Sequence, residues 1–288
     1  MLRIRALEGA DFAAADDVLR AAFHANVSFE PRLRRYLAMQ PDGWLTAEDE
    51  GQVVGLVGAI DYGAFAYVGL MAVRPDRQGL RLGRRLMDEL LAVLDARGTT
   101  CALLDASPSG APLYERSGFV DAGLSHEFWG GDGGDGGSPF TGGDAGGVTV
   151  AVAGTGELDD IVGLDGAFLG APRERLWRWL YATHPEGILT ARDAAGTLAG
   201  YLCLQGPLLG PFGASTPAVA SRLIGAALAK VGHRNVRLQV PEENVEARAL
   251  LAKAGFREVR ALRHMRRGPC STFASWRSIY GKGSYCLG

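Results

Sequence analysis

The chain has 288 residues, a length that suits two domains better than one. Its formal net charge is −2 and 47% of its residues are hydrophobic, so it resembles an ordinary globular protein, and no basic excess points to nucleic acid. No apolar run is long enough to span a membrane and the N-terminal residues lack a signal-peptide core, so we expect a cytoplasmic protein without a membrane partner. Four scattered cysteines form no Cys-x-x-Cys pair, which argues against a metal site and predicts buried or free thiols. They are Cys101, Cys203, Cys270 and Cys286.

The first half of the chain alternates predicted strands and helices. The elements are a strand at 2–6, helices at 11–24 and 31–39, hairpin strands at 44–48 and 53–62, a central strand at 67–73, a helix at 82–96, a strand at 99–104, a helix at 109–117 and a closing strand at 119–128. This order predicts an α/β fold with a mixed, mostly antiparallel sheet and helices on both faces.

The loop that joins the central strand to the helix at 82–96 is rich in arginine. The helix carries an apolar stripe in which leucine recurs every four residues from Leu82 to Leu94. Its first N–H groups have no partner inside the helix and, together with the helix dipole, form an anion site. Arg77, Arg81, Arg84 and Arg85 crowd the same end. Cations beside a positive helix terminus are unfavourable, so we expect an anionic ligand there.

Two motifs in this region resemble those of one enzyme family. Residues 78–83 (Gln-Gly-Leu-Arg-Leu-Gly) resemble the Q/R-x-x-G-x-G/A signature of the GNAT N-acetyltransferases, whose loop holds the pyrophosphate of acetyl-coenzyme A. Arg81 stands where the family has its middle glycine. Residues 114–119 (Tyr-Glu-Arg-Ser-Gly-Phe) resemble the second family signature, a tyrosine on a short helix followed by Gly-Phe.

The resemblance implies acetyl-CoA as cosubstrate and no metal. In the family, backbone groups of the strand before the loop pair with the pantetheine arm and direct an N–H at the thioester oxygen. The residues expected to bind the coenzyme are Met71, Ala72, Val73, Gln78, Gly79, Leu80, Arg81, Leu82, Gly83 and Arg84.

Acetyl transfer to an amine also needs an acid for the departing thiolate and a base for the amine. Tyr114 is the candidate acid, because the family places a tyrosine near the thioester sulfur and a phenol donates a proton more readily than water. Asp105, at the end of the strand at 99–104, is the candidate base. Asp61 and His24 are alternative bases, and for both aspartates the roles of substrate anchor and plain turn residue stay open. His126 and Glu127 lie on alternate faces of the closing strand and are expected to be a surface pair.

The second half of the chain repeats the first. A glycine-rich segment at 130–147 predicts a flexible linker between an N-terminal domain at 1–129 and a C-terminal domain at 148–288. The matching segments are 43–47 with 187–191, 54–57 with 199–202, and 117–119 with 254–256. The second copy is eight residues shorter between these matches, opposite the arginine-rich loop, and has a capped helix start at Thr216 instead. Leu251 stands in the place of Tyr114, so the second copy is expected to keep the GNAT fold without a coenzyme site.

The chain is therefore predicted to be a tandem GNAT protein that transfers an acetyl group from acetyl-CoA to the primary amine of a small molecule by direct attack. Two alternatives stay open, a non-catalytic acyl-CoA-binding module and an acetyltransferase of protein lysines or N-termini. A monomer and a homodimer are both compatible with the sequence.

Overall fold

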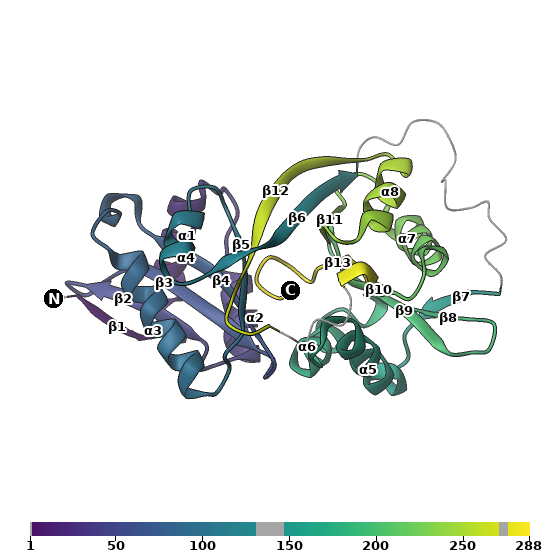
Figure 1. Cartoon of the computed structure of the whole chain (residues 1–288), viewed down its shortest axis with the longest axis horizontal. Coiled ribbons are helices and arrows are strands. Elements are labelled where there is room, and N and C mark those ends of the chain that lie inside the picture. Colours follow the sequence, from purple (N-terminus) through teal and green to yellow (C-terminus); the bar gives the residue numbers. More distant parts are fainter. Residues whose placement is uncertain (1, 131–146, 271–275) are drawn as a thin grey trace. The chain divides into compact units, whose positions relative to one another are not determined.

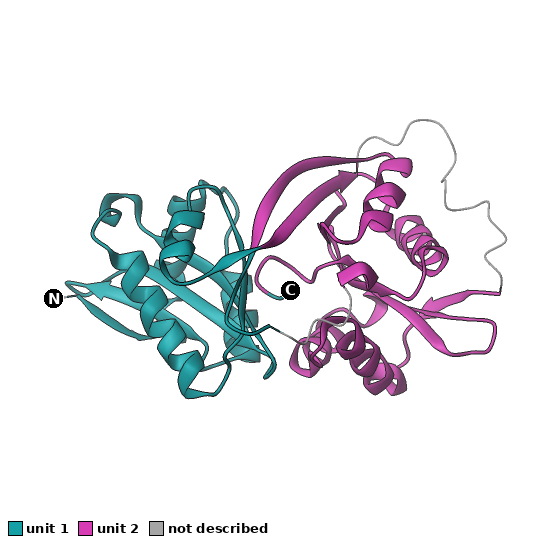
Figure 2. Ribbon diagram, in the orientation of Figure 1, with its two compact units in different colours: residues 1–121, 265–270, 287 teal, residues 122–264, 271–286, 288 magenta. Residues whose placement is uncertain are grey.

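The computed structural model describes residues 2–130, 147–270 and 276–288 (Figure 1). Two compact units divide the chain (Figure 2). Unit 1 comprises residues 1–121, 265–270 and 287, and unit 2 comprises residues 122–264, 271–286 and 288. The predicted linker at 130–147 lies almost wholly outside the described residues. Among those that are described, no helix is long and apolar enough to cross a membrane.

Unit 1 is a mixed sheet with the strand order β1-β2-β3-β4-β5. The first four strands pair antiparallel, whereas β4 and β5 run parallel. Its elements are β1 (Arg3–Ala6), η1 (Gly9–Asp11), α1 (Phe12–Phe23), α2 (Glu30–Met39), β2 (Trp44–Asp49), β3 (Gln52–Asp61), β4 (Ala66–Val73), η2 (Pro75–Arg77), α3 (Leu82–Ala96), β5 (Ala102–Ala106) and α4 (Ala111–Arg116). Every helix and strand expected between residues 2 and 117 is present, with ends that shift by a few residues.

Helices cover both faces of this sheet. The leucine stripe of α3 forms one core with alternate residues of the strands, such as Ala59 and Val68. Leu56 and Ile60 of β3 are fully buried but lie outside that core, and α1 packs on β3 and β4. Because successive strand residues point to opposite faces, the alternation in β3 places one helix layer on each side.

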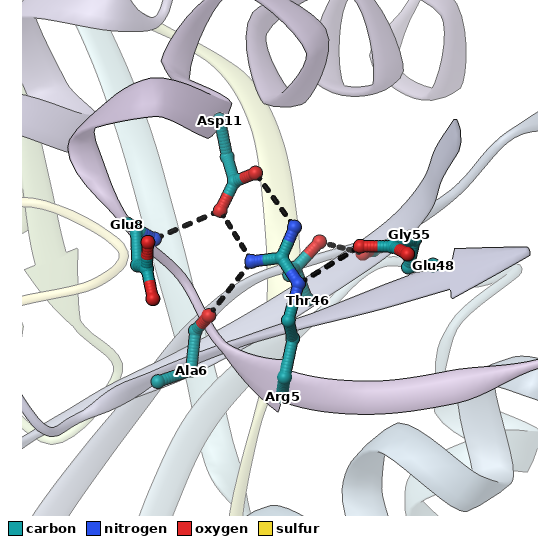
Figure 3. Close-up of polar contacts among 7 residues, drawn as sticks. All are labelled: Arg5, Ala6, Glu8, Asp11, Thr46, Glu48 and Gly55. Carbon is teal, nitrogen blue, oxygen red and sulfur yellow. Dashed lines mark hydrogen bonds and ion pairs between the residues drawn. The ribbon is translucent and has the colours of Figure 1, made fainter. Parts of the chain in front are cut away.

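An arginine at the edge of the sheet joins β1 to the start of α1 (Figure 3). The Arg5 guanidinium donates to both carboxylate oxygens of Asp11, at 2.7 and 2.8 Å, and to Glu48 Oε2 at 2.9 Å. Asp11 Oδ2 also accepts from the Glu8 N–H at 2.9 Å. The hydrogen bonds from Arg5 are the main reason why the pKa of Asp11 lies below its ordinary value.

From β7 to α8, unit 2 repeats this architecture in the same order. Its elements are β6 (Val120–Gly130), β7 (Thr149–Val152), η3 (Thr155–Glu157), α5 (Leu158–Leu169), α6 (Glu174–Thr183), η4 (Pro185–Gly187), β8 (Ile188–Arg192), β9 (Leu198–Gln205), β10 (Leu208–Ala214), α7 (Pro217–Val231), β11 (Arg237–Pro241), α8 (Val245–Lys253), β12 (Phe256–Arg267), η5 (Trp276–Ser278) and β13 (Ile279–Gly281). The strands from β7 to β10 pair antiparallel, β10 and β11 are parallel, and α7 packs on them as α3 does in unit 1. The predicted internal repeat is confirmed.

The loop between the central strand and the following helix differs between the copies, as predicted. In unit 1, residues 74–81 separate β4 from α3, whereas in unit 2 residues 215–216 alone separate β10 from α7. Thr216 caps α7, because its side chain accepts from the Val219 N–H at 3.3 Å. The arginine-rich loop is therefore a feature of unit 1.

The expectation of four free thiols is wrong for two of the cysteines. Cys101 and Cys270 form a disulfide with a Cα–Cα distance of 5.1 Å, while Cys203 and Cys286 are free and buried. Residues 265–270 belong to unit 1, so the chain returns beside the start of β5 after 169 residues. Spacing along the sequence does not reveal such a pairing, because only the fold brings the two segments together.

Candidate active site

A bulge interrupts the central strand of unit 1. Leu56 of β3 pairs with Ala72, but Gly58 pairs with Gly69, so β4 has one more residue than β3 in this interval. Leu70 adopts a positive φ of 52° there. A bulge removes backbone groups from the ladder and leaves them available to a ligand. Leu70 directly precedes Met71, Ala72 and Val73, the strand residues that were predicted to bind the coenzyme.

The loop after β4 turns through two left-handed residues. Gly79 has a φ of 80°, and Arg81, at the N-cap of α3, has a φ of 60° and a ψ of 15°. The left-handed region is easy for glycine and unfavourable for other residues by roughly 1–2 kcal/mol. This conformation explains why the family signature has glycine at the position of Arg81, and shows that the arginine keeps the same turn. The Gln78 side chain supports the loop by donating to the Val73 carbonyl at 3.1 Å.

Around this loop lies an open cavity of about 870 Å³. Eight of the ten residues predicted to bind coenzyme line it, whereas Ala72 and Leu80 do not. The eight are Met71, Val73, Gln78, Gly79, Arg81, Leu82, Gly83 and Arg84. Residues of the opposite wall, Ser109, Gly110, Leu113 and Arg116, were not predicted. They lie on α4 or in the two residues before it, and their place around the helix that follows the next strand was the signal that could have found them.

The cavity carries unpaired positive charge. Arg84 is held by Asp88 at 2.7 Å and by the Arg116 carbonyl at 2.6 Å. Among the described residues, no carboxylate lies within ion-pair distance of Arg81 or Arg116, and both side chains are exposed. No side chain at the N-cap accepts from the first N–H groups of α3. Guanidinium groups and free helix N–H groups around one cavity suit a phosphate-bearing ligand.

Tyr114 lies on α4, beside the cavity but not in its lining. Its ring packs edge-on against Phe119 with 6.0 Å between centroids, and its neighbour Leu113 reaches the cavity instead. The tyrosine is half-buried against the core of unit 1. The family motif therefore forms the predicted short helix, and the role of its tyrosine as an acid stays a prediction.

Asp105 is part of β5 and does not follow it, because the strand extends to Ala106. The parallel pairing of β4 with β5 covers Ala66 with Ala102 and Tyr67 with Leu103. Asp105 lies two residues beyond this pairing, and its Oδ2 accepts from the Tyr67 hydroxyl at 2.7 Å. The carboxylate is half-buried. Tyr67 was not among the predicted site residues, because a tyrosine in an apolar strand is typical of a buried core.

The alternative bases occupy structural positions. Asp61 accepts from the Gly63 N–H and from the Thr99 hydroxyl, both at 2.8 Å, as a turn residue does. His24 is exposed at the left-handed C-cap of α1. The expectation of a surface pair at His126 is wrong, since His126 is 7% exposed and its Nδ1 lies 2.8 Å from Glu258 Oε1. Glu258 comes from β12, a partner that periodicity within β6 cannot indicate.

Two family models match the chain, each described as an acetyltransferase (GNAT) domain. One covers residues 40–121 and the other covers residues 161–281. The chain belongs to the GNAT acetyltransferases. The predicted family is thus confirmed, and the two matches coincide with the two copies of the repeat.

Similar proteins support a tandem GNAT architecture. The N-acetyltransferase YitH of Bacillus subtilis is 29% identical over 217 residues, which are 72% of this chain and 71% of that protein. A solved structure from Pyrococcus horikoshii, assigned as an acetyltransferase, covers 100% of this chain and 96% of its own at 22% identity, with a TM-score of 0.83. A tandem GNAT protein from the clavulanic acid pathway covers 93% and 98% at 18% identity, with a TM-score of 0.63. The two structures establish a shared fold.

GNAT enzymes use acetyl-CoA as cosubstrate, and the cavity of unit 1 fits its diphosphate in charge and in backbone geometry. No cluster of three or more metal-ligating side chains occurs in the part of the chain that the structure describes.

The second GNAT domain covers the equivalent position with its own chain. Leu209 of β10 pairs with Leu204 but Phe212 pairs with Leu202, so β10 has the same bulge as β4. Strand β13 pairs with β10 beside this bulge, and the Lys282 N–H after it donates to the Gln239 carbonyl of β11 at 2.8 Å. The space between β10 and β11 in unit 2 is therefore occupied by β13.

Proposed function

We propose that unit 1 binds acetyl-CoA and transfers its acetyl group to the primary amine of a small molecule by direct attack. The observation that carries this proposal is the cavity at the N-terminus of α3. It combines a left-handed loop, free helix N–H groups and unpaired guanidinium groups next to the bulge in β4. The loop, the N–H groups and the guanidinium groups suit the phosphates of an acyl-coenzyme A, whereas the bulge suits its pantetheine arm and thioester.

The residues of unit 1 provide a complete set of roles for acetyl transfer. Asp105 takes a proton from the substrate ammonium, which frees the nitrogen lone pair for attack on the thioester carbon. Backbone N–H groups at the bulge near Leu70 stabilise the negative charge that develops on the carbonyl oxygen. As the new C–N bond forms and the C–S bond breaks, Tyr114 gives its proton to the coenzyme sulfur, and the nitrogen loses its second proton to solvent to give the neutral amide. Solvent then reprotonates Tyr114 and deprotonates Asp105.

Unit 2 is proposed to have a supporting role without a coenzyme. Its short loop lacks the arginine cluster, and β13 fills the interval between β10 and β11. Leu251 stands in the place of Tyr114. The chain should therefore bind one acetyl-CoA.

A calorimetric titration with acetyl-CoA, followed by a coenzyme-release assay over a library of amines, tests the proposal. We expect one binding site per chain and release of free coenzyme A with at least one small primary amine. Tyr114→Phe should bind acetyl-CoA normally but turn over more slowly, because the coenzyme thiolate then leaves without its proton donor. Phenylalanine keeps the ring and removes only the hydroxyl. The packing against Phe119 is therefore kept, and a slower turnover reports on the hydroxyl.

Three results would contradict the proposal in different ways. Absence of binding would exclude the coenzyme site. Binding without turnover on any amine would favour a non-catalytic acyl-CoA-binding module. Turnover on peptides alone would favour an acetyltransferase of protein lysines or N-termini.

A further inference from the structure

The hydroxyl of Tyr67 is directed at the proposed base. Tyr67 is fully buried in β4, opposite Leu103 of β5, and Asp105 lies two residues further along β5 on the same face of the sheet. The 2.7 Å hydrogen bond thus spans two strands at the point where their pairing ends. The phenol is fixed by the surrounding core, whereas the half-buried carboxylate still reaches solvent.

The position along β4 links this contact to the reaction centre. Tyr67 precedes the bulge at Leu70 by three residues on the same strand. One strand therefore carries both the hydrogen-bond donor for Asp105 and the backbone groups proposed to bind the thioester oxygen. A shift of β4 would move the Tyr67 hydroxyl and the backbone groups at the bulge together, because both belong to one strand.

A phenol that donates to a carboxylate favours the ionised form, because the hydrogen bond is stronger to the charged oxygen than to the neutral acid. It also restricts the rotation of the aspartate side chain. Both effects serve a base, which must be deprotonated before it meets the ammonium and must point at it.

We propose that Tyr67 is a positioning residue that keeps the Asp105 carboxylate ionised and oriented toward the amine. The inference rests on the proposed function of unit 1. Tyr67 does not touch the substrate in this assignment, and acts through Asp105.

The test compares Tyr67→Phe with the wild type in the pH dependence of kcat/KM for the amine. Loss of the hydroxyl raises the pKa of Asp105, so the acid limb of the profile should move to higher pH by about one unit. The KM for acetyl-CoA should stay within about twofold, because Tyr67 does not line the coenzyme cavity. Tyr62→Phe is the matched control, since its hydroxyl donates to the Leu287 carbonyl at 3.1 Å and should leave the acid limb in place.

A second substitution probes the same hydrogen bond without removing it. Genetic replacement of Tyr67 by 3-fluorotyrosine makes the phenol a stronger donor, so the acid limb should move to lower pH. A carbon-13 NMR titration of labelled aspartate reports the pKa of Asp105 in each variant without any turnover. Opposite shifts in the two variants support the inference.

The outcomes separate this inference from the proposed function. If Asp105→Asn keeps full activity, the proposed base is wrong, whatever Tyr67 does. If Asp105→Asn loses activity but neither Tyr67 variant moves the acid limb or the NMR pKa, Asp105 is the base and the positioning role of Tyr67 is refuted.

Discussion

A negative charge placed at the start of α3 should weaken coenzyme binding strongly. Gly83 lines the cavity, and a Cβ atom built on it would lie 3.3 Å from Leu113 and 3.9 Å from Val73, two further lining residues. A side chain at this position therefore extends into the cavity. Gly83→Glu adds a carboxylate there, while Gly83→Gln adds the same shape without the charge.

The size of the effect follows from the charges involved. Two unit charges 4 Å apart near a protein surface interact by about 4 kcal/mol. Since the cavity is open and a glutamate can turn outward, we expect about half of this for Gly83→Glu, or roughly 2 kcal/mol. That energy corresponds to a roughly 30-fold weaker affinity than in Gly83→Gln.

Calorimetric titration of acetyl-CoA into both variants measures this difference. Repeating the titrations at about 1 M salt should reduce the difference in affinity between the two variants, because the Debye length falls from about 10 Å at 0.1 M to about 3 Å. A melting curve of each variant checks that the fold is intact. Equal affinities of the two variants at low salt would refute a diphosphate site at the helix start.

Two further predictions concern the stability of unit 1. Gly58→Ala should lower the free energy of unfolding by about 1–3 kcal/mol in urea denaturation, because the added methyl group would lie 2.0 Å from the Trp44 ring. Gly156→Ala is its control, because a Cβ atom built on Gly156 meets no neighbouring group within 4 Å. Equal losses of unfolding free energy in the two variants would contradict the packing argument. The pKa of Asp11 is lowered in the folded state by its hydrogen bonds with Arg5. The ionised carboxylate therefore stabilises the folded state above the ordinary pKa of 3.8, and this stabilisation is lost as the pH falls below that value. Arg5→Gln should lower the free energy of unfolding at neutral pH and make it fall less steeply as the pH drops. If the free energy of unfolding falls as steeply in Arg5→Gln as in the wild type, the Arg5–Asp11 pair is not a cause of this fall.

Local patterns along the chain were sufficient for the architecture. The leucine stripe of α3 and the alternation of the strands encode elements through contacts between near neighbours, so the expected helices and strands of unit 1 appear in order. The family signature at 78–83 works in the same way, since a loop and the helix start after it are contiguous in sequence. The shortened loop at Thr216 was likewise visible as a difference between two copies of one pattern.

Contacts between distant segments were decided by the tertiary structure. Periodicity cannot show that Tyr67 meets Asp105, that Cys270 meets Cys101, or that β13 enters the interval between β10 and β11. Each of these depends on which strands lie side by side and on where their pairing ends. The sequence by itself thus determined the family, the repeat and most of the coenzyme loop, because these are written in short-range patterns. The surroundings of the proposed base and the filling of the second site arise from segments that only the folded sheet brings together.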